Sequence, residues 1–317
     1  MLFDGFGRKI DYLRISVTDR CNLSCFYCRK NGIEGFPRNE ILTFEEIEFI
    51  VDIFKNEFEI KKLRLTGGEP LMRKGIDSLI CRLCSKGLSV NLTTNGILLF
   101  KFAKFLAEQG IGVNLSLDTL NHNKFKFITG FDFLDYVLDG LEQFLSNGGN
   151  LKINTVVLKG VNDDEIFDLI DFAGKKGVEI RFIEFMPFVG KDVWSSYFVS
   201  EDEIKSRIER KGNLVFLGNG SSTARVYLFD NRVRIGFIST VTRPFCDSCS
   251  RIRITSDGKI VLCMFDDRGY SLKKFLRPEF DGDALRKFII DIVKKKPRGF
   301  VDLKDKMAKF EMIKLGG

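Results

Sequence analysis

The sequence predicts an α/β fold in which helices surround a parallel sheet. β-rich runs alternate with amphipathic helical runs six times, which is the order of a parallel sheet with crossover helices. The residues best suited to chemistry follow these β-rich runs, where the sites of such folds lie. With 317 residues, the chain can also bury a sizeable core. A doubly wound sheet and a barrel-like sheet both fit this pattern.

The expected elements follow in chain order. The six β-rich runs span residues 12–17, 62–66, 88–94, 112–117, 151–158 and 178–185. Thr43, three residues before Glu46, forms a capping box that predicts a helix over residues 44–54. A helix over residues 163–175 is expected from the helical stripe of Ile166, Leu169, Ile170 and Phe172.

The pattern changes near residue 212, beyond a helix that Ser200 and Glu203 predict with a second capping box. Shorter elements are expected from here on: β-like runs at 213–218, 224–229 and 232–238, a strand pair around 255–259 and a helix near 283–294. We therefore expect two regions, residues 1–212 and residues 213–317.

Each expected strand of the first region ends at a distinctive motif. In chain order these are the cysteines of "CNLSCFYC", then "GGEP", "TTNG", "SLD", Lys159 and "EFMP". Because the carboxyl ends of parallel strands meet at one edge of a sheet, we expect these motifs to form a single site.

The composition favours a globular protein of the cytoplasm. Hydrophobic residues make up 44% and charged residues 29%. No apolar run could span a bilayer and the start lacks the layout of a signal peptide, so no membrane association is expected. In reducing cytosol, the eight cysteines favour metal binding or chemistry over disulfides. The net charge of +7 fits a Lys-rich surface or an anionic ligand, but no dense basic block marks a nucleic-acid partner.

The first cysteine group has three members, Cys21, Cys25 and Cys28. A closed zinc site takes four ligands, and the single histidine, His122, stands far away in a segment expected to be an exposed turn. Three thiolates on an iron–sulfur cluster would leave one iron open, as a catalytic metal requires.

A second group repeats this shortage. Cys246, Cys249 and Cys263 again offer three thiols without a fourth, so a second open cluster is expected. Cys81 and Cys84 look like a further metal-binding pair, but they lie in a helical pattern that favours packing over ligation. The alternative is that one of them completes a cluster.

The spacing Cys-x₃-Cys-x₂-Cys, with Tyr27 before the third cysteine and "GGEP" at residues 67–70, resembles the radical S-adenosylmethionine (SAM) superfamily. Within it, the chain is similar nearly end to end to the GTP 3′,8-cyclase family of MoaA type, which opens molybdenum cofactor biosynthesis. The likeness rests on "RLTGGEPLMR", "EIRFIEFMP" with Trp194 beyond it, "FCDSCSRIRITSDGK" and the final Gly-Gly. One departure is Arg29-Lys30, where the family usually has Met-Pro.

This resemblance implies a fold and an activity. The fold is an incomplete (β/α)6 TIM-like barrel with a smaller C-terminal region that carries a second iron–sulfur cluster. The activity is that of a lyase that converts GTP into 3′,8-cyclo-7,8-dihydro-GTP by radical chemistry. The cofactors are two 4Fe-4S clusters and SAM.

The same resemblance assigns residues. The two clusters would be held by Cys21, Cys25 and Cys28 and by Cys246, Cys249 and Cys263. SAM would meet Tyr27, Gly68, Glu69, Thr94, Ser116 and Met186, and Gly67 and Gly68 would allow its close approach. GTP would meet Arg14, Lys62, Arg64, Lys159, Arg181, Arg251 and Arg253. The catalytic geometry would be completed by Arg251, Gly316 and Gly317.

Basic residues inside strands, such as Arg14 and Arg64, allow two interpretations. Alternation along a strand could point them to solvent. We expect the set to face the interior instead, because its members fall on one side of the fold and can bind a polyanion there. A lone buried charge would be costly.

Partners and alternatives complete the prediction. The family implies an electron donor such as flavodoxin or ferredoxin, the next pathway enzyme (cyclic pyranopterin monophosphate synthase), and a homodimer as one allowed state.

A peptide-modifying radical SAM enzyme with an auxiliary cluster is one alternative, although such enzymes tend to carry more cysteines. A non-catalytic metal-binding or RNA-binding protein is another, and three-cysteine groups without a fourth ligand disfavour it.

Overall fold

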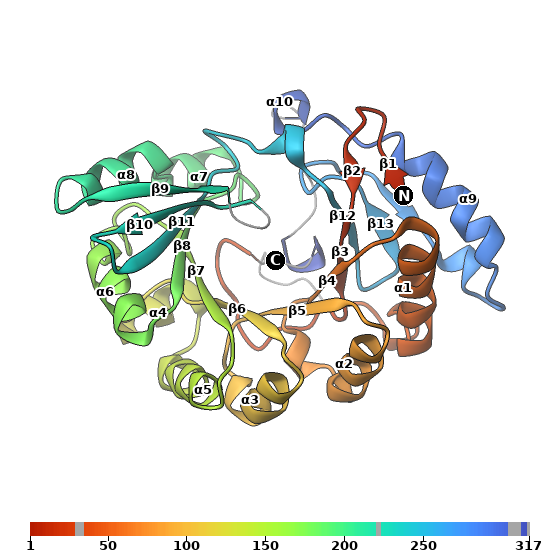
Figure 1. Cartoon of the computed structure of the whole chain (residues 1–317), viewed down its shortest axis with the longest axis horizontal. Helices are drawn as coiled ribbons and strands as arrows, with labels where there is room; N and C mark the ends of the chain where they lie inside the picture. Colours follow the sequence, from red (N-terminus) through yellow and green to blue (C-terminus); the bar gives the residue numbers. More distant parts are fainter. Residues whose placement is uncertain (29–34, 220–222, 304–311, 316–317) are drawn as a thin grey trace. The chain divides into compact units, whose positions relative to one another are not determined.

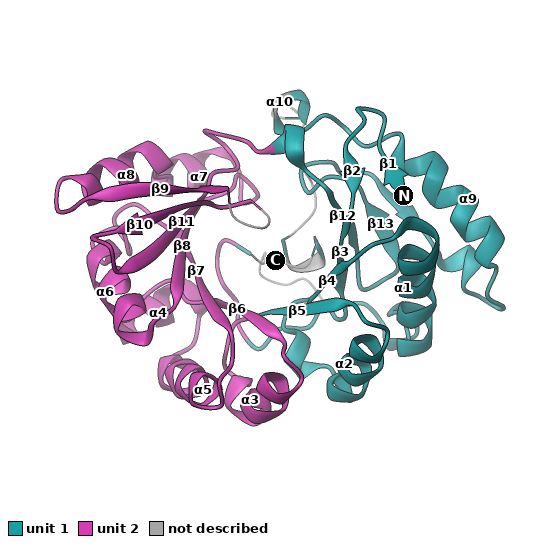
Figure 2. Cartoon of the chain, viewed as in Figure 1, with its two compact units in different colours: residues 1–22, 28–93, 246–317 teal, residues 23–27, 94–245 magenta. Residues whose placement is uncertain are grey.

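The computed structural model of the chain describes residues 1–28, 35–219, 223–303 and 312–315 (Figure 1). The chain divides into two compact units (Figure 2). Unit 1 comprises residues 1–22, 28–93 and 246–317, and unit 2 comprises residues 23–27 and 94–245. Each unit draws on residues from both sides of position 212, and the division of the chain at that position stays a prediction.

Unit 1 contains a sheet in the order β14-β13-β12-β3-β4-β5. Four consecutive strands of this sheet are parallel: β12 (Arg251–Ile254), β3 (Tyr12–Ser16), β4 (Lys62–Thr66) and β5 (Ser89–Thr94). The hairpin strands β13 (Lys259–Val261) and β14 (Gly269–Ser271) continue antiparallel from β12. A separate short hairpin pairs β1 (Leu2–Phe3) with β2 (Lys9–Ile10).

The strands of unit 1 have one apolar and one polar face, because successive side chains of a strand point to opposite sides. The apolar face is fully buried and is made by Leu13, Ile15, Leu63, Leu65, Ile252 and Ile254. The alternate positions form the other face and are occupied by Tyr12, Arg14, Lys62, Arg64, Arg251 and Arg253.

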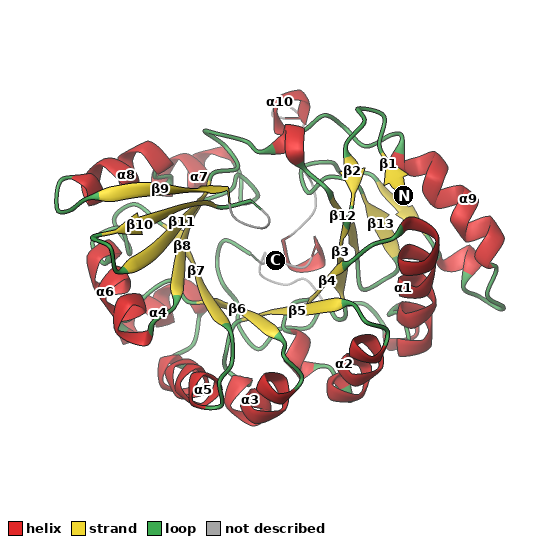
Figure 3. Cartoon of the chain, in the orientation of Figure 1, coloured by secondary structure: helices red, strands yellow, loops and turns green. Residues whose placement is uncertain are grey.

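Helices α1 (Phe44–Phe58), α2 (Ile76–Ser85) and α9 (Gly282–Val293) belong to unit 1. Figure 3 shows α1 and α2 on one side of the strands β3, β4 and β5. The predicted capping box is present at the start of α1: the Thr43 hydroxyl accepts from the Glu46 N–H, and the Glu46 carboxylate accepts from the Thr43 N–H at 2.7 Å. The remaining short elements are η1 (Arg38–Glu40), η2 (Pro70–Met72), η3 (Cys246–Ser248), η4 (Lys273–Phe275), α10 (Phe300–Leu303) and α11 (Met312–Leu315).

Unit 2 contains a sheet in the order β6-β7-β8-β11-β10-β9. The strands β6 (Gly112–Ser116), β7 (Leu151–Val157), β8 (Glu179–Glu184) and β11 (Val233–Ile238) are parallel to one another. An antiparallel extension is made by β10 (Arg225–Phe229) and β9 (Leu214–Asn219). The helices are α3 (Leu99–Glu108), α4 (His122–Thr129), α5 (Leu134–Ser146), α6 (Ile166–Lys176), α7 (Lys191–Tyr197) and α8 (Glu201–Glu209).

One helix start and one capping box of unit 2 differ from the prediction. The helix expected from residue 163 begins at Ile166, because residues 161–164 form turns and Asn162 uses its side chain to cap the end of β7. The Ser200 hydroxyl accepts from the Glu203 N–H as predicted, but the Glu203 carboxylate pairs with Arg207 and does not close a capping box.

All six β-rich runs of the first region are strands, and the three β-like runs after residue 212 are the strands β9, β10 and β11. The helix expected near residues 283–294 is α9. The predicted α/β class with parallel strands is therefore confirmed. Among the described residues, no helix is long and apolar enough to cross a bilayer.

Candidate active site

The "GGEP" motif is fastened to the start of the first cysteine loop within unit 1. The Gly68 N–H donates to the Thr18 carbonyl at 2.7 Å, and the Glu69 N–H donates to the Arg20 carbonyl at 2.8 Å. A Cβ atom on Gly68 would lie 2.4 Å from the Arg20 carbonyl oxygen, and one on Gly67 would lie 2.6 Å from that of Thr18. These glycines therefore permit a close approach to the cysteine loop of the chain itself, which the sequence had not indicated, and the close approach of SAM stays a prediction.

The middle of the same loop, residues 23–27, belongs to unit 2. The Ser24 N–H donates to the Thr129 carbonyl at 2.9 Å, and the Phe26 N–H donates to that of Ile128 at 3.1 Å, so the loop runs along the end of α4. The Tyr27 hydroxyl donates to the carboxylate of Asp118 at the end of β6. Burial raises the pKa of Asp118 to about 6 although the bond from Tyr27 lowers it.

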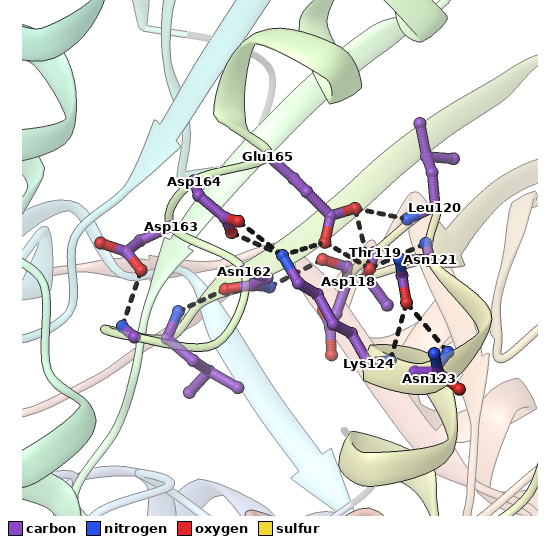
Figure 4. Close-up of polar contacts among 12 residues, drawn as sticks. Asp118, Thr119, Leu120, Asn121, Asn123, Lys124, Asn162, Asp163, Asp164 and Glu165 are labelled. Atoms are coloured by element: carbon purple, nitrogen blue, oxygen red, sulfur yellow. Dashed lines mark hydrogen bonds and ion pairs between the residues drawn. The ribbon is translucent and has the colours of Figure 1, made fainter.

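The loops that follow β6 and β7 are locked to each other, as Figure 4 shows. The buried Glu165 carboxylate accepts from the Thr119 hydroxyl at 2.7 Å, from the Leu120 N–H at 2.9 Å and from the Lys124 ammonium at 2.9 Å. The Asn162 amide donates to the Asp118 carbonyl at 2.7 Å. This network fixes the backbone that presents Asp118, and through Asp118 it fixes Tyr27.

A small cavity of about 30 Å³ opens beside this network in unit 2. Its walls include Cys25, Tyr27, Asn95, Ser116 and Asp118. Two residues predicted to contact SAM, Tyr27 and Ser116, are thus brought together next to a cysteine of the first group. Sequence reasoning did not single out Asn95 and Asp118, although "TTNG" and "SLD" had marked both strand ends.

The other predicted SAM contacts lie at strand ends. The buried Thr94 hydroxyl accepts from the Gly96 N–H at 3.1 Å. Met186 is half-buried after β8. Glu69 is fully buried, and its carboxylate accepts from the Leu71 N–H at 3.0 Å. Cys21 and Cys28 are half-buried in unit 1, and Cys25 is half-buried in unit 2.

The second cysteine group lies in a cationic setting within unit 1. The Cys249 N–H donates to the Cys246 carbonyl at 3.1 Å, and the Arg8 guanidinium donates to the same carbonyl at 2.7 Å. The buried Lys296 ammonium donates to the carbonyls of Arg251, at 3.0 Å, and Leu262. Burial raises the pKa of Cys249. The positive charges of Lys296 and Arg251 lower it and outweigh burial, so the pKa of this thiol is about 6.

This donor set fits an iron–sulfur cluster better than a single ion. Among the described parts of the chain, no three His, Cys, Asp or Glu side chains are arranged for one metal ion. The three thiols nevertheless interact, since Cys263 and Cys249 both raise the pKa of Cys246, after burial as the larger cause. A multi-iron cluster takes its thiolates at separate corners, and nearby cations favour the thiolate form.

Five of the predicted GTP contacts lie on one face of the unit 1 sheet. In register, Arg253, Arg14 and Arg64 form one row across β12, β3 and β4, and Arg251, Tyr12 and Lys62 form the next row. Burial, and then the neighbouring Arg253, hold the pKa of Arg14 well below its usual range. Burial and Arg251 lower the pKa of Arg253 to about 10. The row of Arg253, Arg14 and Arg64 therefore concentrates positive charge on one face of the sheet.

The other two predicted contacts lie in unit 2. Arg181 is buried on β8, and its Nε donates to the Glu179 carboxylate at 2.6 Å. Lys159 follows β7 and is exposed. The ion pair of Arg181 was missed, although the two residues stand two apart in one strand and must share a face.

Several predictions concern residues elsewhere. Cys81 and Cys84 lie in a helix as predicted, but Cys81 is exposed and Cys84 only half-buried, so the buried packing expected for Cys81 is wrong. His122 is exposed as predicted, but it is the first residue of α4 and does not lie in the expected turn. The Trp194 indole donates to the Phe185 carbonyl at 2.8 Å. The pairs Arg29-Lys30 and Gly316-Gly317 lie outside the described residues.

Two family models match the chain. Residues 15–173 match the Radical SAM superfamily, and residues 178–301 match Molybdenum Cofactor Synthesis C. The chain is 45% identical over 306 residues to GTP 3′,8-cyclase of Thermodesulfovibrio yellowstonii, covering 93% of this chain and 94% of the relative. It is 40% identical to GTP 3′,8-cyclase of Peptoclostridium acidaminophilum, covering 100% and 98%, and 38% identical to the mitochondrial GTP 3′,8-cyclase of Arabidopsis thaliana, covering 100% and 84%.

Similar solved structures include SuiB of Streptococcus suis bound to S-adenosylmethionine. The TM-score is 0.65 at 17% identity, covering 95% of this chain and 75% of SuiB. SuiB has also been solved bound to precursor peptide SuiA, with a TM-score of 0.64. At this identity the likeness shows the fold alone, and it confirms the fold class that the sequence predicts.

Proposed function

The chain belongs to the radical SAM superfamily and, within it, to the GTP 3′,8-cyclase family, and we propose that its two cysteine groups and its cationic sheet face together carry out the conversion of GTP into 3′,8-cyclo-7,8-dihydro-GTP. It is a radical SAM enzyme of molybdenum cofactor synthesis and uses a 4Fe-4S cluster with SAM. The observation that carries the substrate proposal is the row of Arg253, Arg14 and Arg64 in unit 1, beside Cys249.

The first cysteine group would hold the cluster that binds SAM. When bound, the cluster and SAM would supply the radical chemistry by which GTP is converted. The chain contributes position: the Tyr27–Asp118 bond and the contacts of Gly68 and Glu69 fix the cysteine loop at both of its ends. SAM would be oriented by its six predicted contacts, Tyr27, Gly68, Glu69, Thr94, Ser116 and Met186.

The second cysteine group would hold a second 4Fe-4S cluster with Cys246, Cys249 and Cys263 as ligands. Arg8 and Lys296 support this role, because both bind backbone carbonyls around the thiols and add positive charge. A cluster held by these three thiols would supply a binding position for the guanine end of GTP, next to the cationic face.

The triphosphate of GTP carries about four negative charges, which require fixed cations. Arg14, Lys62 and Arg64 would bind it with Arg251 and Arg253, because all five lie on one sheet face. Lys159 and Arg181 stay predicted contacts from unit 2. Arg251, Gly316 and Gly317 stay predicted catalytic residues.

The partners of this reaction are proposals. GTP is the substrate, an electron donor such as flavodoxin or ferredoxin would supply the reducing electron, and cyclic pyranopterin monophosphate synthase would take the product. The cytoplasm and a homodimer stay predictions from the sequence.

The likeness to SuiB, at 17% identity, concerns the fold alone and does not favour a peptide-modifying function, whereas the relative that is 45% identical over 93% of this chain is a GTP 3′,8-cyclase. An anaerobic count of iron and sulfide separates the remaining candidates. Two clusters give about eight of each per chain. One or two zinc ions per chain would support a non-catalytic metal protein instead.

Cys263→Ala tests the division between the two groups. We expect the variant to cleave SAM and to lose cyclisation of GTP, because only the second group is damaged. The matched variant Cys21→Ala should lose both reactions. Normal cyclisation by Cys263→Ala would show that the second group does not hold the substrate.

A further inference from the structure

A row of polar side chains crosses the parallel strands of unit 2. The strands β6, β7 and β8 lie side by side (Figure 1). In register, Ser116 of β6 pairs with Asn154 of β7, and Asn154 pairs with Arg181 of β8. Adjacent residues of such a row point to the same side of the sheet. Asn154 thus lies between a wall residue of the small cavity and a buried guanidinium.

The side-chain oxygen of Asn154 is buried and accepts no hydrogen bond from the described residues. The neighbouring charged side chains, in contrast, have hydrogen-bond partners. Arg181 is bound by Glu179 at 2.6 Å, and Lys152, two residues before Asn154, is bound by the same carboxylate at 3.1 Å. A buried acceptor without a donor destabilises the folded state, so such a group in a native protein requires an explanation.

The chemistry of the row limits what the missing donor can be. An ammonium group would be repelled by the neighbouring Arg181 guanidinium. A hydroxyl is neutral, and it can donate to the amide oxygen while accepting from the amide nitrogen or from Ser116. The ribose of a nucleoside carries two adjacent hydroxyls of this kind.

We propose that Asn154 is a ligand-binding residue that accepts a hydrogen bond from a ribose hydroxyl, with Ser116 and Arg181 on either side of the nucleoside. This inference rests on the proposed function, which supplies two nucleoside ligands, SAM and GTP. Both carry the same chemistry, and their binding is measured separately.

The test uses reconstituted protein and equilibrium dialysis, with SAM in one arm and GTP in the other. Asn154→Leu keeps the approximate shape and removes the acceptor. It should weaken one ligand about tenfold, which corresponds to one hydrogen bond. Asn154→Asp keeps an acceptor in place and should restore most of that affinity. Asn114→Leu, on the same face of β6 and two residues before Ser116, is the matched control and should change neither affinity.

Thermal unfolding without ligand separates binding from a structural role. Because Asn154→Leu removes an unpaired buried acceptor, its melting temperature should equal or exceed that of the parent protein. Weakening of SAM alone or of GTP alone supports the proposal and names the nucleoside. Unchanged affinity in both arms overturns it, as does a fall of several degrees in the melting temperature with both affinities reduced alike. A parent protein that does not bind GTP would refute the proposed substrate, while the SAM arm would still decide the role of Asn154.

Discussion

Replacing Arg14 by Met should stabilise the protein in the absence of GTP and weaken its binding of GTP. Arg14 is the middle member of a row of three arginines, with Arg253 on one side and Arg64 on the other. Burial and both neighbours lower its pKa, so its charge is unfavourable in the folded protein. Met has a similar length and no charge, so the substitution removes the repulsion without leaving a large cavity.

The magnitude follows from the spacing of the strands. Neighbouring strands lie about 4.8 Å apart, so charged side chains in one row come within about 6 Å. At an effective dielectric constant of about 20, each like-charge pair then contributes about 3 kcal/mol of repulsion. Attraction to Tyr12 reduces the gain, and a net stabilisation of about 2 kcal/mol is expected. That corresponds to a rise of about 4 °C in melting temperature.

The assay is a pair of measurements on the reconstituted protein, thermal unfolding without GTP and equilibrium binding of GTP. The affinity should fall about 10- to 100-fold, because a charge-assisted hydrogen bond to phosphate is lost. Arg286→Met is the control, since this exposed arginine of α9 pairs with Glu57 at 2.9 Å on the surface. Arg14→Met that melts lower than the parent protein and binds GTP normally would refute the reasoning.

Two further predictions concern the frame of the site. Gly68→Ala should lose first-cluster iron and stability, because its Cβ would lie 2.4 Å from the Arg20 carbonyl oxygen. Gly282→Ala is the control, since a Cβ there meets only ordinary contacts from 3.4 Å outward. Equal iron content in the two variants would contradict this prediction. Burial raises the pKa of Glu46, but bonds from Arg277 and from the Thr43 N–H outweigh it and leave the pKa below its ordinary value. A depressed carboxyl pKa stabilises the fold above the pKa of the unfolded chain, about 4.3, and this contribution is lost as the pH falls through the folded value. The Glu46→Gln variant should therefore be about 1–2 kcal/mol less stable than the parent protein at pH 7. Denaturant unfolding should show this difference in stability shrinking below about pH 4. A difference that stays constant across pH would exclude the ion pair as its source.

The local part of this fold could be predicted from the sequence, and the long-range part could not. Strands and capping residues depend on a few neighbouring residues, so the six β-rich runs and the Thr43–Glu46 box were readable. The close approach of Gly68 to the Arg20 carbonyl could not be predicted, because Arg20 comes from another segment of the chain, and the approach of SAM to Gly68 stays a prediction. The bond from Arg277 to Glu46 joins residues 231 positions apart and leaves no local signal.

The exposure of Cys81, by contrast, follows from a local pattern of the sequence. Ile76, Leu79, Ile80 and Leu83 form the buried stripe of α2. Cys81 follows Ile80 by one residue, about 100° around the helix, which turns its side chain out of that stripe. The helical period of α2 therefore indicates an exposed Cys81 and outweighs the general preference of cysteine for burial.

Buried polar groups of this protein fall into two classes. The Glu184 carboxylate accepts from the Glu201, Val241 and Thr242 N–H groups at 3.0 Å each, as a structural group should. Arg14 and Asn154 are different: one sits among like charges, and the other has a buried oxygen without a donor among the described residues. A phosphate group at Arg14 and a hydroxyl group at Asn154 would relieve each of them within its own unit. Stability and ligand affinity should therefore change in opposite directions when either is replaced by an apolar residue, whereas replacing Glu184 should lower both together.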